Sequence, residues 1–232
     1  GEYDRAVRVH EHLLSRGDLG RVDRERAQHA LALDFLKAGL LDRAEQALQR
    51  LEGTPFEAEA RLALLAIYER SSDWSLAAAI ADKMDRAAQG DFSTRQAHYL
   101  CEQAATLLGK VQTEETRRLL QRAIATAPHA ARARIDLAAM QQASGDHAAA
   151  FSTLRTMGEA TPAALPLAAA RLAQAASSSQ QPQAALDLLT SSYATSPSLD
   201  VLEAIVALTA SGTGDNEQAR TWYIQHLERE PS

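Results

Sequence analysis

The sequence predicts an all-α fold built from stacked helical hairpins, and three observations support this prediction. The first is a pair of amphipathic segments near the N-terminus. Leu31 and Phe35 share one helical face, and Leu41 and Leu48 share the face of a second helix. Gly39 lies between them, where the chain must reverse, because glycine adopts the left-handed conformation that ends a helix at little steric cost. This unit is a helical hairpin.

The other two observations are two series of residues that recur at a regular spacing. Ala44 lies where the helices of this hairpin would cross, and small residues recur at that position roughly every 34 residues, at Ala6, Ala77, Thr116, Ala150, Ala185 and Ala219. Prolines that would follow second helices recur with nearly the same spacing, at Pro128, Pro162, Pro197 and Pro231. Two series with the same spacing of about 34 residues are typical of tetratricopeptide repeats (TPR). They predict a right-handed superhelix, an α-α solenoid.

This register divides residues 1–232 into one truncated and six complete repeats of a single solenoid. Residues 1–16 are the second helix of the truncated repeat, and the complete repeats span 23–53, 56–89, 93–128, 129–162, 163–197 and 198–232. We expect thirteen main helices, one from the truncated repeat and two from each complete one. Repeat 93–128 is irregular, since Val111 and Thr116 stand where glycine and alanine are expected, so its turn should be longer or its packing looser.

Local signals justify the individual elements along the chain. Val9 is expected on the apolar face of the first helix, and Asp23 is expected to cap the N-terminus of the second. Trp74 takes the aromatic position at a turn between two helices. Residues 177–182 and 211–216 are rich in Ser, Gln and Gly but keep the phase of the repeat, so we expect turns there and not linkers.

The composition supports the same fold. Hydrophobic residues make up 46% of the 232 residues but aromatic residues only 5%, which favours a core of Ala and Leu between close-packed helices. A net charge of −6 argues against a nucleic-acid surface, which needs a clustered basic face. The single Cys101 excludes an internal disulfide and fits a reducing compartment. No apolar run approaches the roughly 20 residues of a membrane span, so we expect no membrane insertion by this fragment.

No motif in the chain predicts catalysis. The Gly-Lys pair at 109–110 suggests a phosphate loop, but Ala104 and Val111 stand where that motif requires Gly and Ser or Thr. His98 and Cys101 would share a helical face, but a metal site needs two more ligands, so a core or groove-lining role is favoured. We therefore expect a non-enzyme, with no catalytic, cofactor-binding or metal-binding residues in this fragment.

The expected binding surface is the concave wall of the superhelix, which the first helix of each repeat would line. We expect partner-binding residues on this wall at Arg26, His29, Leu33, Lys37, Glu59, Glu69, Arg70, His98, Arg132 and Gln142. The same wall would also include Leu62, Cys101, Ile135 and Gln174. The alternative for each of these residues is an ordinary solvated side chain that binds no partner.

Four segments are more specific than the repeat pattern: GEYDRAVRVHEHLL (1–14), DFLKAGLLDRAEQALQRL (34–51), IYERSSDWSLAAAIADKM (67–84) and AHYLCE (97–102). In order and approximate spacing they resemble the repeat region of the LapB family of lipopolysaccharide assembly proteins from Gram-negative bacteria, and the resemblance covers residues 1–107. It implies a non-enzymatic scaffold or adaptor for protein–protein interaction. Such an adaptor brings the deacetylase LpxC to the membrane protease FtsH and is restrained by an inner-membrane partner, PbgA (YejM).

The resemblance also implies a place at the cytoplasmic face of the inner membrane for the full-length protein. In that family an N-terminal membrane helix anchors the repeats, and a C-terminal rubredoxin-like module binds a metal through two CxxC pairs. We expect this fragment, which begins part-way through a repeat, to be soluble and cytoplasmic without either element. The unpaired first helix should fray or be covered by a second copy, which predicts a homodimer.

Two alternatives to this function stay open. One is a TPR adaptor of another bacterial envelope or secretion system. The other is the accessory repeat region of a glycosyltransferase-type protein. An upstream apolar span and downstream CxxC pairs in the full gene would decide for the LapB family, whereas a fused catalytic domain would decide for the transferase.

Overall fold

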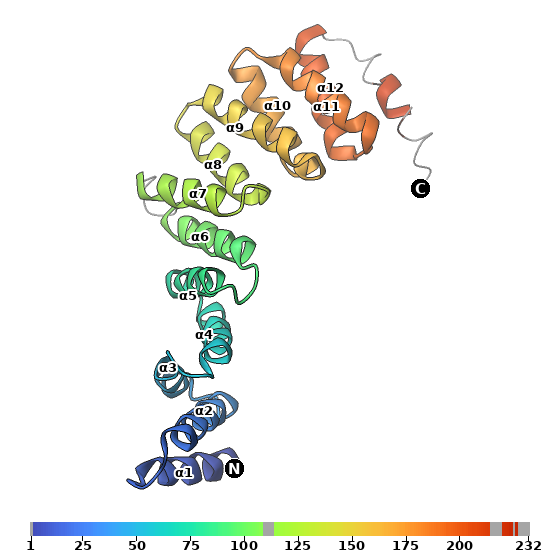
Figure 1. The fold of residues 1–232 in the computed structure, drawn as a ribbon. Helices are drawn as coiled ribbons and strands as arrows, with labels where there is room; N and C mark the ends of the chain where they lie inside the picture. Colours follow the sequence, from blue (N-terminus) through green and yellow to red (C-terminus); the bar gives the residue numbers. More distant parts are fainter. Residues whose placement is uncertain (1, 109–113, 214–219, 225, 227–232) are drawn as a thin grey trace. The chain divides into compact units, whose positions relative to one another are not determined.

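The computed structural model describes residues 2–108, 114–213, 220–224 and 226 (Figure 1). Within these ranges the chain forms twelve α-helices, one 3₁₀ helix and no strand, which confirms the predicted all-α class. None of the described helices is long and apolar enough to cross a membrane. Contacts divide the chain into two compact units, residues 1–103 and 104–232, and each unit has a hydrophobic core of its own.

The first unit consists of antiparallel helices that pack on their neighbours in sequence. Its helices are α1 (Glu2–Ser15), α2 (Arg21–Lys37), α3 (Leu41–Gln49), α4 (Glu57–Ser71), α5 (Trp74–Arg86) and the greater part of α6 (Ser93–Leu108). α2 packs on both α1 and α3, and α4 packs on both α3 and α5 (Figure 1). Each first helix of a hairpin therefore lies against the second helices of its own repeat and of the preceding one.

The turns of the two complete hairpins in this unit share one backbone conformation. Gly39 has a φ of 75°, which confirms the predicted left-handed residue, and the next amide, that of Leu40, donates to the Phe35 carbonyl at 2.9 Å. In the following repeat Ser72 takes the same position with a φ of 59°, and the Asp73 amide donates to the Tyr68 carbonyl at 2.9 Å. A serine is tolerated in this strained region because the surrounding hydrogen bonds hold the turn.

The small residues of the repeat register are buried where helices cross. Ala32 and Ala44 have no exposed surface, and the same is true of the register positions Ala77, Thr116, Ala150 and Ala185. Side chains of this size let the helix backbones approach closely, and a larger one would force them apart. The register is thus confirmed at these five positions. Ala6 is only partly buried, and Ala219 lies outside the described residues.

The second unit repeats the hairpin pattern with a core of Leu, Ala and a few aromatic residues. Its helices are α7 (Glu114–Thr126), α8 (Ala131–Ala143), α9 (His147–Ala160), η1 (Pro162–Ala168), α10 (Ala169–Ser178), α11 (Pro182–Thr195) and α12 (Leu199–Thr213). Phe151, Leu154, Leu172 and Leu189 are almost completely buried in this core. Residues 220–224 and 226 are also helical, and the other residues of the thirteenth expected helix lie outside the described ranges.

The prolines follow second helices as predicted. Pro128, Pro162 and Pro197 each lie two residues beyond the end of α7, α9 and α11, whereas Pro231 is outside the described part. The next segment differs from the expectation of one regular helix, because residues 162–168 form the 3₁₀ helix η1 before α10 begins. Pro166 accounts for this, since it lacks an amide hydrogen and its ring would clash with the carbonyl four residues earlier in an α-helix.

Three local expectations are wrong. Val9 is 58% exposed, and Val7 instead faces the core with 6% exposure, because α1 turns a different side to α2. Asp23 is not a cap: α2 begins at Arg21, and Asp23 lies inside its first turn, where its charge still favours the helix N-terminus. Residues 211–213 are the end of α12 and not a turn. The irregular turn expected around Val111 lies outside the described residues.

Candidate functional site

The residues predicted for the concave wall lie on the first helices, and all of them except Cys101 are exposed or half-buried. In α2, Arg26, Leu33 and Lys37 are exposed on one side of the helix, as their spacing of four and seven residues requires. In α4, Leu62 is 49% exposed and Arg70 is also exposed. We call this surface of the first unit the first-helix face, defined by Arg26, His29, Leu33, Lys37, Glu59, Leu62, Glu69, Arg70 and His98.

Several residues of the first-helix face join neighbouring repeats. His29 on α2 stacks on Phe56 with ring centroids 4.6 Å apart, and its Nε2 lies 3.1 Å from Glu59 Oε2 on α4. Glu69 on α4 accepts hydrogen bonds from Arg95 Nη2 at 2.7 Å and from the Tyr99 hydroxyl, both on α6. These side chains hold successive first helices together, so they are less available to a partner than the sequence suggested.

The Glu69–Tyr99 contact shifts the pKa of both groups. Burial raises the pKa of Glu69 on its own, but hydrogen bonds from Tyr99 and Arg95 stabilise the carboxylate and leave its pKa below the usual value. Burial and the hydrogen bond to Glu69 raise the pKa of Tyr99 to about 12. At neutral pH the pair is thus a carboxylate that accepts from a neutral phenol.

An aromatic cluster lies beside this pair. The Trp74 ring stacks on the Tyr99 ring with centroids 6.2 Å apart. His98 approaches the Trp74 ring edge-on, with 6.1 Å between the ring centroids. Cys101 was expected to line the wall, but it is 2% exposed and belongs to the core. Among the described residues, no three His, Cys, Asp or Glu side chains gather closely enough to hold a metal ion.

In the second unit the predicted wall residues are also engaged within the protein. Arg132 Nε lies 3.5 Å from Asp136 Oδ2 one turn along α8. Gln142 accepts a hydrogen bond from Arg171 Nη1 at 2.9 Å and donates to the Arg171 carbonyl at 3.2 Å, which links α8 to α10. Ile135 packs against the core, whereas Gln174 is exposed.

The structure therefore separates two groups among the predicted partner-binding residues. His29, Glu59, Glu69, His98, Arg132 and Gln142 have polar or ring contacts inside their own unit. Lys37 and Arg70 are exposed and form no ion pair with any described residue. Arg26 forms a long ion pair, with 3.9 Å between its Nη1 and Asp23 Oδ1, and its side chain is 69% exposed. The second group retains the charge that a partner could use.

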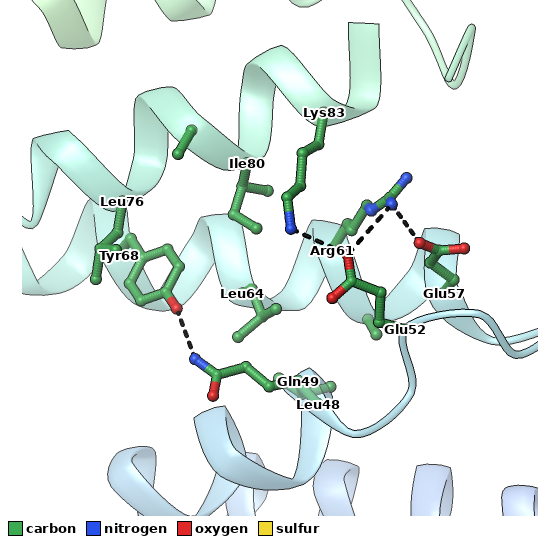
Figure 2. Close-up of a pocket in the computed structure, with 12 residues that line it drawn as sticks. Leu48, Gln49, Glu52, Glu57, Arg61, Leu64, Tyr68, Leu76, Ile80 and Lys83 are labelled. Atoms are coloured by element: carbon green, nitrogen blue, oxygen red, sulfur yellow. Dashed lines mark hydrogen bonds and ion pairs between the residues drawn. The ribbon is translucent and has the colours of Figure 1, made fainter. Parts of the chain in front are cut away.

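A cavity on the opposite side of α4 was not predicted. It has a volume of about 330 Å³ and lies between α3, α4 and α5, where Figure 2 shows its lining. Leu48, Leu64 and Ile80 form an apolar floor, and Leu76 is 44% exposed at its edge. We call it the apolar cavity. It is large enough to take one or two apolar side chains.

Polar groups close both ends of the apolar cavity. At one end the Tyr68 hydroxyl donates to Glu45 Oε1 at 2.8 Å and accepts from Gln49 Nε2 at 3.3 Å. Burial raises the pKa of Tyr68.

At the other end Lys83 Nζ donates to Glu52 Oε1 at 3.0 Å (Figure 2). Arg61 pairs with Glu57 and lies 4.0 Å from Glu52. The hydrogen bond from Lys83 lowers the pKa of Glu52. The charges of this end thus neutralise one another.

No family model matches the chain. It is 31% identical over 156 residues to lipopolysaccharide assembly protein B of Escherichia coli strain K12, a match that covers 67% of this chain and 40% of the relative. The protein of the same name from Haemophilus influenzae strain Rd is 31% identical over 163 residues, which cover 70% and 41%.

The chain is similar to part of lipopolysaccharide assembly protein B. This finding confirms the resemblance predicted from the four segments. The chain spans about two fifths of the length of these curated relatives. Solved structures with a similar backbone include MamA, with a TM-score of 0.48, 14% identity and coverage of 76% of this chain and 93% of MamA. PilF of Pseudomonas aeruginosa follows with a TM-score of 0.45, 18% identity and coverage of 100% and 95%.

Sequence reasoning missed the apolar cavity because it looked only at the first helices. The signal was nevertheless present. Leu76 is an apolar residue in the first turn of α5, outside the buried stripe that contains Ala77, Ala81 and Met84. This leucine lines the cavity between α3, α4 and α5.

Proposed function

We propose that this chain is the protein-binding repeat region of a lipopolysaccharide assembly factor and has no catalytic role of its own. The observation that carries the proposal is the 31% identity to lipopolysaccharide assembly protein B over 67% of the chain. The exposed charges of the first-helix face support it, because a stack of helical hairpins presents an extended surface suited to another protein.

The finer assignment rests on the family resemblance. In the full-length protein, the repeats would lie at the cytoplasmic face of the inner membrane and bring LpxC to FtsH for degradation. PbgA (YejM) would restrain this activity. We assign the contact with these partners to Arg26, Lys37 and Arg70, since their charges have little or no use inside the first unit.

A double reversal, Lys37→Glu with Arg70→Glu, tests this assignment in the full-length, membrane-anchored protein. We expect capture of LpxC or FtsH in a pull-down to fall several-fold, with a greater loss at low salt, where charges are screened least. The melting curve should hardly change, because exposed single charges contribute within about 0.5 kcal/mol.

The matched control is Arg5→Glu with Arg86→Glu, two exposed arginines on second helices. Loss of capture in the control alone would place the binding surface elsewhere and leave the scaffold function standing. Failure of the unaltered full-length protein to capture either partner would refute the LpxC and FtsH assignment.

A further inference from the structure

A second cavity, of about 550 Å³, lies between α1, α2 and α3 in the first unit. Its polar lining is rich in hydrogen-bond donors, and its floor is apolar. The lining residues are Arg24, Arg43, Arg50, Gln28, Gln46, Glu11, Ser15, Leu14, Leu31, Phe35 and Ala47. We call it the arginine groove. It lies on the side of α2 opposite the first-helix face, since Gln28 and Leu31 are about half a turn away from Arg26 and Leu33.

The arginine groove is the repeat equivalent of the apolar cavity. Every lining residue on α2, on α3 and at the end of α3 has a counterpart 33 residues later that lines the apolar cavity. The pairs are Arg24 and Glu57, Gln28 and Arg61, Leu31 and Leu64, Phe35 and Tyr68, Arg43 and Leu76, Gln46 and Ala79, Ala47 and Ile80, and Arg50 and Lys83. The two sites thus share one helical framework and differ in their side chains.

The counterparts of two carboxylates are missing from the arginine groove. In the apolar cavity, Glu52 pairs with Lys83, and Glu57 pairs with Arg61. The position of Glu57 is taken by Arg24 in the preceding repeat. The position of Glu52 falls on Leu14, 38 residues earlier by the step from Ala6 to Ala44. Neither replacement can accept a hydrogen bond through its side chain.

Two donors are left without acceptors as a result. Arg50, the counterpart of Lys83, is exposed and forms no ion pair with any described residue. Gln28, the counterpart of Arg61, has a buried Nε2 atom with no hydrogen-bond partner in the described structure. A buried donor without a partner costs free energy that an incoming acceptor would recover.

The remaining polar groups of the groove are partly used. Arg43 pairs with Glu11, the one carboxylate in the lining, and its guanidinium lies 4.3 Å from the Phe35 ring centroid. Arg24 donates to the carbonyls of Leu14 at 3.2 Å and Arg16 at 3.1 Å. Three arginines therefore face one glutamate, within a chain whose net charge is −6.

We propose that the arginine groove binds an acidic peptide segment of a partner protein, whose carboxylates take the places that Glu52 and Glu57 occupy in the next repeat. Arg43 on α3 and Arg50, the residue that follows α3, are seven residues apart, about 10 Å along the helix axis, so carboxylates spaced along a peptide reach both more readily than one compact anion. The floor of Leu31, Phe35 and Ala47 accepts an apolar residue between them. This site is independent of the proposed function, which concerns the opposite side of α2.

Fluorescence anisotropy with a labelled peptide, Gly-Glu-Leu-Glu-Glu-Leu-Glu-Gly, tests the proposal on the intact chain. We expect saturable binding that Arg50→Ala weakens about tenfold, the effect of losing one charge-assisted contact. The matched variant Lys83→Ala, at the equivalent but neutralised position, should stay within about twofold of the unaltered chain. A peptide with glutamine in place of glutamate should not bind.

A second variant acts without removing Arg50. Arg24→Glu returns a carboxylate to the position of Glu57 and should weaken peptide binding, with a somewhat lower melting temperature because it also loses the hydrogen bonds to the Leu14 and Arg16 carbonyls. Equal effects of Arg50→Ala and Lys83→Ala, or binding of the glutamine peptide, would overturn the proposal. So would Arg50-dependent binding of phosphatidylglycerol vesicles with no binding of the acidic peptide, because a lipid surface would then be the ligand.

Discussion

The apolar cavity and the arginine groove occupy equivalent places in successive repeats, yet they have opposite chemical character. In the apolar cavity Glu52 and Glu57 satisfy Lys83 and Arg61, so the site offers mainly apolar surface. In the arginine groove these carboxylates are replaced, and Arg50 keeps its charge for an external group. One helical framework can therefore carry two recognition chemistries, because the ion pairs across a groove depend on a few side chains and not on the helices.

The largest expected effect tests whether the two sites share one framework. Leu31 and Leu64 form equivalent parts of the two floors and are 7% and 4% exposed. Replacement of either by alanine should destabilise the protein by about 2–5 kcal/mol, since each leaves a cavity in a packed core. Urea denaturation measures this. Gln46→Ala, on the rim of the arginine groove, is the control and should be nearly neutral. A large difference between the two leucines would show that the grooves are not equivalent.

Exchange of the carboxylates should convert one site into the other. The double substitution Glu52→Leu with Glu57→Arg removes the acceptors of the apolar cavity and frees Lys83 and Arg61. We expect the chain to gain a second binding site for the acidic peptide, seen as a doubled stoichiometry in titration calorimetry. Glu59→Leu, an exposed carboxylate on the first-helix face, is the control. An unchanged stoichiometry would mean that these carboxylates do not decide what the groove binds.

A smaller effect concerns Tyr68, whose counterpart in the arginine groove is Phe35. Tyr68→Phe removes the hydroxyl that bonds to Glu45 and Gln49 and should cost about 1–3 kcal/mol, the range for two hydrogen bonds. Thermal denaturation would measure the loss. A Glu45→Gln variant retains an acceptor for the hydroxyl and should be milder. Stabilisation by Tyr68→Phe would show that the buried hydroxyl destabilises the folded protein in spite of its hydrogen bonds.

The smallest expected effect is a dependence on alkaline pH. The pKa of Tyr68 is raised by burial, and that of Tyr99 is raised to about 12. A phenol with a raised pKa favours the folded state in its neutral form. This contribution is complete below the unfolded pKa of about 10 and is lost as the pH rises toward the folded value. We expect the melting temperature to fall over this range and Tyr99→Phe to reduce the slope. An unaltered slope in both phenylalanine variants would contradict this reading.

The sequence by itself determined the hairpins and their phase. Gly39 adopts the predicted left-handed conformation, and Ala44, Ala77 and Ala150 are completely buried at the crossings. These features can be predicted from the sequence because helix periodicity, a glycine at the C-terminus of a helix and a proline beyond it act over a few residues. The same local signals led to errors at Val9 and Asp23, where the side of α1 that meets α2 and the start of α2 depend on packing between helices.

Only the tertiary structure decided which side chains remain free. Glu69 was expected to meet a partner, but it bonds to Arg95 and Tyr99, which lie 26 and 30 residues away on α6. The ion pair between Lys83 and Glu52, 31 residues apart, likewise makes the apolar cavity neutral, whereas the arginine groove is charged. Such contacts join different repeats, so they depend on helix crossing angles and rotamers that the spacing of residues along one helix does not encode.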